Sequence, residues 1–118
     1  MTDQIERYKS FIDALVSLSS SVYARRMRQG QWPSTGEDAA MSRLVSRLPS
    51  EDRELLATAL EEARTGGMHD MLAYFQEQMD RKKLAVHIEG SELPNSPFGT
   101  ELFYDFVCRL KGDEWPKS

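Results

Sequence analysis

Two short stretches of the chain carry the side chains best suited to acid–base or metal chemistry. His69 and Asp70 are adjacent, and His87 and Glu89 are two residues apart. Imidazole and carboxylate groups transfer protons and bind metal ions, but a structural or catalytic metal site usually has three or four ligands. Each stretch supplies only two. Solvated polar faces explain both pairs more simply, so we predict no metal site and no catalytic residue.

The chain lacks the common motifs of catalysis and cofactor binding. It has no P-loop, no Gly-rich dinucleotide turn, no His-Glu-x-x-His and no paired cysteines. Its single cysteine, Cys108, cannot form an internal disulfide and is predicted to be a small core residue. The sequence therefore favours a noncatalytic protein without a cofactor.

Aromatic side chains gather toward the end of the chain. Five of the eleven aromatic residues lie within residues 98–115. They cannot all face inward on one short helix, so Phe103 or Tyr104 must face outward, and exposed Tyr and Trp are common at binding hot spots. Trp115 either closes the end of the fold as a buried plug, which we favour, or serves as an exposed anchor for a partner.

Both tryptophans follow a glycine and precede a proline, at Gly30–Pro33 and Gly112–Pro116. A glycine just past a helix can take the left-handed conformation that ends it, and a residue before proline is held extended. Each tryptophan is therefore expected on a stiff, non-helical segment. If both helix ends lie at one pole of the fold, Trp32 and Trp115 cover it together.

Two basic clusters stand at the ends of predicted helices. Arg25, Arg26 and Arg28 form one cluster, and residues 81–83 form the other. Cations at a helix C-terminus offset the helix dipole, and this capping role is the simpler interpretation. Merged into one patch, the clusters would bind an acidic protein surface or a phosphate. Arg25 and Arg26 are therefore binding candidates, together with Trp32, Tyr104 and Trp115.

The spacing of apolar residues predicts a mainly helical fold. Periodic apolar positions indicate a long helix over residues 3–28, another between Ser34 and Pro49, two helices separated by Gly66-Gly67, and a last one over 100–110. The serines at 17–21 mark either a kink or, more simply, a solvated helix face. Alternation over residues 84–88 predicts a short strand or hairpin. We expect one domain over residues 1–118, a compact bundle of four to five helices with a short strand or β-hairpin before the C-terminal helix.

Charge and hydropathy narrow the classes of partner. The net charge is −4, and residues 51–118 hold eight basic against fourteen acidic side chains. Nucleic acid is an unfavourable partner for such a chain, because affinity for it comes largely from neutralised phosphates. No stretch approaches the roughly 18 apolar residues of a membrane span, and the acidic start differs from a secretory signal. We expect a cytoplasmic protein.

Several segments together resemble a family of small bacterial proteins of unknown function. The resemblance lies in Pro97–Leu102, Tyr104–Val107, Trp115-Pro116, Tyr23–Arg26 with Trp32-Pro33, and Gly66–Asp70. It covers most of the chain. It implies a bacterial or phage origin and one intact domain, and it supplies no activity or site residues.

Two functions of different classes fit these observations. The first is a noncatalytic protein-interaction module, such as a regulator, an immunity protein or an inhibitor of a defence or effector protein, and homodimer formation through the aromatic C-terminal region is one version of it. The second is a small-molecule or metal-binding domain, or a minor enzyme, with a pocket between the Trp32 loop and the C-terminal tail. Its polar groups would include His69 and Asp70.

Overall fold

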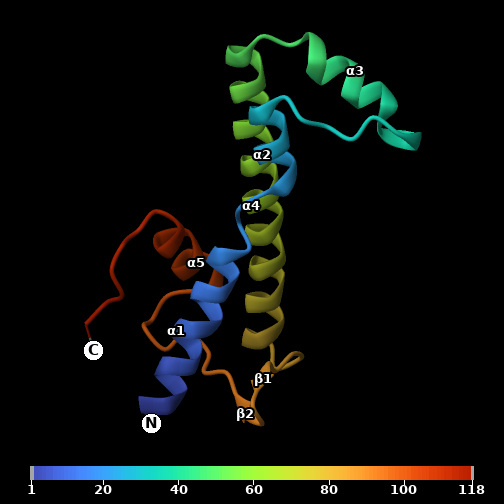
Figure 1. The fold of residues 1–118 in the computed structure, drawn as a ribbon. Helices are drawn as coiled ribbons and strands as arrows, with labels where there is room; N and C mark the ends of the chain where they lie inside the picture. Colours follow the sequence, from blue (N-terminus) through green and yellow to red (C-terminus); the bar gives the residue numbers. More distant parts are fainter. Residues whose placement is uncertain (1, 118) are drawn as a thin grey trace. The chain divides into compact units, whose positions relative to one another are not determined.

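The structure is a computed structural model that describes residues 2–117, and the side chains of residues 4–117. Its elements in order are α1 (Thr2–Ser17), α2 (Val22–Gln29), the 3-10 helix η1 (Gly36–Asp38), α3 (Ala39–Arg47), α4 (Ser50–Asp80), β1 (His87–Ile88), β2 (Ser91–Glu92) and α5 (Leu102–Leu110) (Figure 1). The predicted class is confirmed, since the chain is mainly helical with a small hairpin before the last helix. Within the described range, no helix is both long and apolar enough to cross a membrane.

Contacts along the chain divide it into two compact units. The first unit combines the residues up to Leu18 with those from Gly66 onward, and the second unit comprises Ser19–Thr65. Helix α4 supplies its first half to the second unit and its second half to the first unit. Each unit has its own hydrophobic cluster, and each is described separately below.

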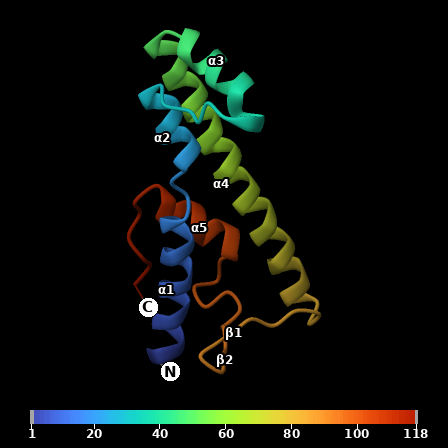
Figure 2. The same cartoon turned by 45° about the vertical axis from the view of Figure 1, so that its right-hand side comes forward.

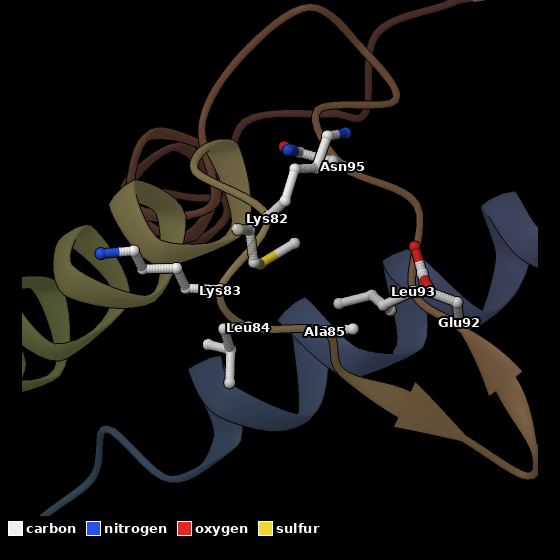
Figure 3. Close-up of a pocket in the computed structure, with 8 residues that line it drawn as sticks. Lys82, Lys83, Leu84, Ala85, Glu92, Leu93 and Asn95 are labelled. Atoms are coloured by element: carbon white, nitrogen blue, oxygen red, sulfur yellow. The ribbon is translucent and has the colours of Figure 1, made fainter.

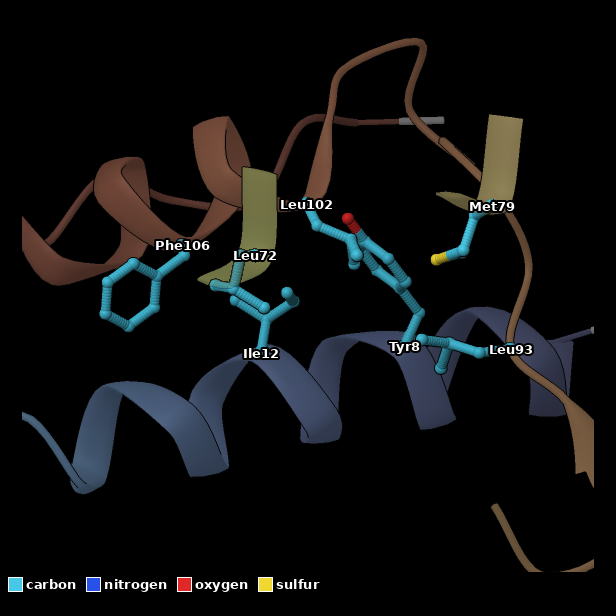
Figure 4. Packing of buried hydrophobic residues seen from close by; sticks show 7 residues of the cluster. All are labelled: Tyr8, Ile12, Leu72, Met79, Leu93, Leu102 and Phe106. Atoms are coloured by element: carbon cyan, nitrogen blue, oxygen red, sulfur yellow. The ribbon is translucent and has the colours of Figure 1, made fainter. Parts of the chain in front are cut away.

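The core of the first unit joins α1, the second half of α4 and α5. Figure 4 shows side chains from these three helices and from the loop after β2 pointing toward one another. The buried members are Tyr8, Ile12, Leu72, Met79, Leu93, Leu102 and Phe106. Tyr8 and Ile12 are four residues apart, so they lie on the same face of α1 and are both fully buried.

The hairpin of the first unit is a minimal one. β1 and β2 pair antiparallel, with His87 opposite Glu92 and Ile88 opposite Ser91. Glu89 and Gly90 connect them, and both have positive φ values of 51° and 81°. Positive φ at both central residues defines the type I′ turn, whose twist matches that of paired strands. The hairpin predicted from the alternating residues is therefore present, although its strands are short.

The second unit is built from α2, η1, α3 and the first half of α4 around a small cluster. Its buried residues are Ala24, Met27, Val45 and Ala57, with Trp32, Leu48 and Leu60 packed against them. Gly30 ends α2 with a φ of 67°, and the Gln31 N–H donates to the Arg26 carbonyl at 2.9 Å. This is the left-handed helix end expected from the glycine before the first Trp-Pro pair.

The single helix predicted over residues 3–28 is wrong, because the chain leaves the helix between Ser17 and Val22. Ser21 has an extended backbone, and its Oγ accepts a hydrogen bond from the Ala24 N–H at 3.2 Å. A serine that satisfies a free N–H in the first turn begins a new helix at that point. The serine run is therefore the boundary between α1 and α2, not a solvated helix face.

The predicted break at Gly66-Gly67 is also wrong, since α4 runs as one helix of 31 residues (Figure 2). Each glycine inside a helix costs about 1 kcal/mol relative to alanine. Residues on both sides of the pair contact a core, with Ala57 buried in the second unit and Leu72 in the first. Burial on either side offsets the weak helix propensity of two residues.

Candidate functional site

Helix α5 places one carboxylate on its buried face. Asp105 follows apolar residues in the helix and is only 4% exposed. Its Oδ2 accepts a hydrogen bond from the Tyr8 hydroxyl of α1, and its Oδ1 accepts one from the Thr100 hydroxyl at 2.5 Å. Burial of a carboxylate without such donors is strongly unfavourable. The two hydroxyls therefore allow Asp105 to face inward.

The hydroxyl of Tyr8 is a fixed hydrogen-bond donor. Burial of the side chain, together with the Asp105 carboxylate, raises the pKa of Tyr8 far above its ordinary value. Both effects disfavour the phenolate, since it would be a second negative charge in a desolvated place. Tyr8 keeps its proton throughout the neutral range, and its contact with Asp105 joins α1 to α5.

Thr100 was predicted to lie at the start of the last helix, but α5 begins at Leu102. The Thr100 side chain is committed to Asp105, and the residue at the cap position, Glu101, makes no side-chain cap. Instead, the Leu102 N–H donates to the side-chain carbonyl of Gln76 on α4 at 2.8 Å. A distant glutamine therefore satisfies a free donor in the first turn of α5.

Arg109 connects α5 to α1 and to the segment that follows α5. Its Nε and Nη2 donate to the two oxygens of Asp13, at 2.8 and 3.2 Å, and its Nη1 donates to the Asp113 carbonyl at 2.8 Å. The Asp13 carboxylate raises the pKa of Arg109, so the guanidinium stays charged. A two-pronged pair of this kind fixes orientation as well as charge. All three nitrogens of Arg109 are already committed.

Trp115 lies against the core of the first unit. Its ring stacks on Phe98 with centroids 5.4 Å apart, meets the edge of Tyr8 at 6.1 Å, and has the Arg109 guanidinium 5.0 Å from its centroid. Its Nε1–H donates to Asp13 at 3.4 Å. With its ring contacted by other side chains and its polar atom bonded, Trp115 is a half-buried plug within its unit.

A small pocket lies beside α5 and the segment that follows it, and we call it the α5 pocket. Its volume is about 150 Å³. It is lined by Thr100, Tyr104, Asp105, Cys108, Arg109, Asp113, Glu114, Trp115 and Pro116. The lining includes three carboxylates and one guanidinium, and that guanidinium is paired with Asp13. The electrostatic character of the pocket is therefore acidic, with two aromatic side chains beside the carboxylates.

Tyr104 is the exposed aromatic residue of this pocket, with 52% of its surface accessible. Its interaction with Cys108, one turn along α5, raises the pKa of Tyr104 above its ordinary value. Tyr104 is therefore neutral near pH 7, with an accessible side chain at the pocket. The prediction that Phe103 or Tyr104 faces outward is met by Tyr104, while Phe103 packs against the core of the first unit.

The remaining binding candidates, Trp32, Arg25 and Arg26, lie in the second unit and do not line the α5 pocket. Trp32 packs on Tyr23, with ring centroids 5.5 Å apart, and contacts the small core. The Arg26 guanidinium lies over the Tyr23 ring, 5.8 Å from its centroid, and Arg25 is exposed. Arg28 pairs with two glutamates of α4. The two basic clusters thus belong to different units.

The two acid–base pairs are not part of the α5 pocket. The His69 ring packs edge-on against Phe103 at 5.1 Å, and its Nδ1 is 3.3 Å from the Asp70 carboxylate, which is exposed. His87 pairs with Glu92 across the hairpin. Among the described residues, no three His, Cys, Asp or Glu side chains are grouped so that they could hold a metal ion.

Two larger hollows in the first unit have lining residues of both charges. One, of about 440 Å³, lies beyond the end of α4. Figure 3 shows that Lys83 extends away from the other labelled side chains, while Glu92 belongs to strand β2 of the hairpin. The other, of about 600 Å³, lies along α1, where Arg7 and Glu89 form an ion pair at 3.8 Å. Neither hollow has the clear charge preference of the α5 pocket.

The fold and the site define a mainly helical protein with a minimal hairpin and an acidic, aromatic pocket beside its last helix. The model of a family of unknown function (DUF6547) matches residues 1–117. The chain belongs to this family, in agreement with the resemblance seen in its sequence. No curated protein and no solved structure gives a significant match to the chain.

Proposed function

We propose that this protein is a noncatalytic interaction module that binds a protein partner through the α5 pocket, and that the pocket receives a basic side chain of that partner. A regulator, an immunity protein or an inhibitor would act in this way, by occupying a partner without changing it chemically. The single observation that carries the proposal is the charge of the lining. Asp113 and Glu114 are exposed, the buried Asp105 adds a third negative charge to the lining, and the one guanidinium of the lining, Arg109, is already paired.

The size and the aromatic lining of the pocket support a side chain as its ligand. Sites for drug-sized molecules are about 300–1,000 Å³, and the α5 pocket has about half the lower value. Its volume suits the end of one arginine or lysine. Tyr104 adds a ring face near the carboxylates, and a cation that contacts both gains electrostatic attraction from each. Tyr residues also contribute strongly to protein interfaces because their rings are rigid.

The hydroxyl groups near the pocket support a binding role over a catalytic one. Tyr8 keeps its proton far above neutral pH, and the Thr100 hydroxyl donates a hydrogen bond to Asp105. A general base or an activated nucleophile needs a group that can release or accept a proton near the working pH. These two hydroxyls are occupied as donors within the fold.

The test uses two blocked tripeptides, Gly-Arg-Gly and Gly-norleucine-Gly, titrated into the labelled protein while the Tyr104, Asp113 and Trp115 signals are followed by NMR. The arginine peptide should shift these signals in a saturable way, and added salt should weaken the effect. The norleucine peptide keeps a linear side chain without the charge and should have little effect. Equal binding of the two peptides would contradict the proposal.

A charge-neutral variant separates the pocket from general acidity. Asp113→Asn with Glu114→Gln removes two pocket charges with little change in shape, and it should weaken the arginine peptide about tenfold, since exposed pairs contribute up to about 1 kcal/mol each. The matched control, Asp70→Asn with Glu101→Gln, removes two exposed carboxylates outside the pocket and should bind like the wild type. The same pair of variants, used to capture proteins from source cells, identifies the partner as the protein lost only with the pocket variant.

A further inference from the structure

The second unit has a small core for its size. It comprises residues 19–65, yet two of its four buried core residues are alanines, Ala24 and Ala57. A unit of this size buries a smaller fraction of its surface than a larger domain does, and its stability is correspondingly marginal. Hydrophobic burial within this unit alone is therefore limited.

The same unit also exposes many large apolar side chains. Its exposed members are Val22, Tyr23, Met41, Leu44, Leu55 and Leu56, of which Leu55 is 71% exposed. Scattered apolar residues are normal on a protein surface. Here, however, exposed apolar residues occur on α2, α3 and α4 of a unit whose core is poor. Such a surface gains stability when another apolar surface covers it.

The outward face of α3 combines apolar and basic residues. Leu44 is 41% exposed, and the exposed Arg47 lies one turn after it on the same side of the helix. Arg43, also exposed, lies one turn before Arg47, so the two arginines line one edge of this surface. Helix α3 contains no acidic residue. Among the side chains of residues 4–117, neither of these arginines has a partner in an ion pair, so both charges are available to a surface that packs against α3.

The outward face of α4 in the second unit has the opposite charge. Leu55 has Glu51 four residues before it, Asp52 three residues before it and Glu62 seven residues after it, so all three carboxylates flank it on one side of the helix. These carboxylates are exposed, and within the described part of the chain none of the three forms an ion pair. The face therefore has an apolar centre and acidic flanks.

We propose that the second unit binds a second copy of this chain, with α3 of each copy packed on α4 of the other. Leu44 then covers Leu55 of the partner copy, and the two arginines of α3 face the carboxylates of α4. A two-fold arrangement uses the same two faces twice, so each copy both supplies and receives the basic helix. The occupant is a second copy because both complementary faces occur on the same unit.

The overall charge of the unit is compatible with this pairing. Residues 19–65 contain seven arginines and seven acidic side chains, so two copies of the unit do not repel each other by net charge. Separating the basic charges on α3 from the acidic charges on α4 fixes the pairing to one register. This interface is independent of the α5 pocket, whose lining residues all belong to the first unit.

The test measures the mass of the full chain in solution by sedimentation equilibrium over a range of micromolar concentrations. The wild type should be a dimer whose dissociation constant rises with salt. Two variants reverse charge on opposite faces, one with Arg43→Glu and Arg47→Glu, the other with Glu51→Lys and Glu62→Lys. Each variant alone should dimerise about 100-fold more weakly or worse, because like charges then meet in both contacts.

Mixing the two variants gives the decisive result. In a mixed dimer, the acidic α3 of the first variant meets the basic α4 of the second. The other contact joins the basic α3 of the second variant to the acidic α4 of the first, as in the wild type. The mixture should therefore form heterodimers with nearly wild-type affinity. An unfolded variant cannot give this rescue, and circular dichroism of each variant checks folding separately. Leu55→Glu should abolish dimers, while Met71→Glu, an equally polar change at an exposed position of α4 in the first unit, should not.

Two outcomes overturn the proposal. A wild type that remains monomeric at high micromolar concentration shows that the two faces do not bind each other. A dimer that survives both charge reversals and Leu55→Glu uses another surface. Loss of arginine-peptide binding in the α5 pocket variants, by contrast, bears only on the proposed function, because those variants leave the second unit unchanged.

Discussion

Replacing Tyr8 by phenylalanine removes one hydroxyl and leaves Asp105 with only one of its two donors. Tyr8 is fully buried, and Asp105 is nearly so. A hydrogen bond to a charged group contributes about 1.5–3 kcal/mol, and the carboxylate cannot turn to water for a substitute. We expect Tyr8→Phe to lower the free energy of unfolding of the first unit by about 2 kcal/mol. The ring itself, with its contacts to Phe98 and Trp115, is retained.

The assay is urea unfolding followed by the fluorescence of Trp115 in a Trp32→Phe background, so that the signal reports the first unit. Asp105→Ala should cost more than Tyr8→Phe, about 3 kcal/mol or above, because it leaves the Tyr8 hydroxyl buried without an acceptor. The double variant should cost less than the sum of the two, with a coupling of about 1–2 kcal/mol. Additive effects, or a loss below about 0.5 kcal/mol for Tyr8→Phe, would refute this account of the buried contact.

Comparison with Tyr8→Phe also tests how the stability of the wild type responds to alkaline pH. The pKa of Tyr8 is raised in the folded state, so its contribution is complete below the unfolded value near 10 and declines as pH rises beyond that value. By about pH 11 the wild type should have lost roughly 1.4 kcal/mol more than Tyr8→Phe, relative to pH 8. Parallel curves for the two proteins would show that the hydroxyl has an unperturbed pKa.

Four further substitutions test the interior of α4, the end of α2 and the plug. Gly66→Ala and Gly67→Ala should each stabilise the protein by about 0.5–1 kcal/mol, since both positions are helical and an added Cβ meets nothing within 4 Å. Gly30→Ala should instead destabilise it by about 1 kcal/mol or more, because φ is 67° and the new Cβ would lie 3.3 Å from Arg53. Trp115→Ala should cost about 2–3 kcal/mol, below the value for a fully buried tryptophan. Thermal melts measure all four, and a Trp115→Ala loss of only a few tenths would mean an exposed anchor.

The helical class and the hairpin were predictable from the sequence because both depend on local spacing. Apolar residues at helical intervals identified all of the helical regions, and the alternation after Lys83 identified the hairpin. The helix boundaries were harder. The serine run resembles a solvated helix face, yet Ser21 is a typical capping residue and begins α2. Gly66-Gly67 resembles a helix break, yet packing on both sides keeps α4 intact.

The candidate site was only partly predictable. The crowding of aromatics predicts that Phe103 or Tyr104 faces outward, and the structure exposes Tyr104. The favoured role of Trp115 as a plug agrees with its stacking on Phe98. The importance of Asp105 was missed. A charged residue on the apolar face of a short helix was a visible signal, but its partner Tyr8 lies 97 residues away, and spacing alone cannot identify a contact of that range.

The first unit is assembled from both ends of the sequence, and this affects the order in which the chain can fold during synthesis. α1 is made before α5, but Tyr8 and Asp13 contact residues of α5 and of the segment after it. α5 itself has nine residues, too few to be stable alone, and its first turn depends on Gln76. Residues 19–65, by contrast, are continuous and leave the ribosome together. The nascent chain must therefore carry α1 without its α5 contacts until α5 and the segment after it appear, and chains that stop before Trp115 should be preferred substrates of chaperones and proteases.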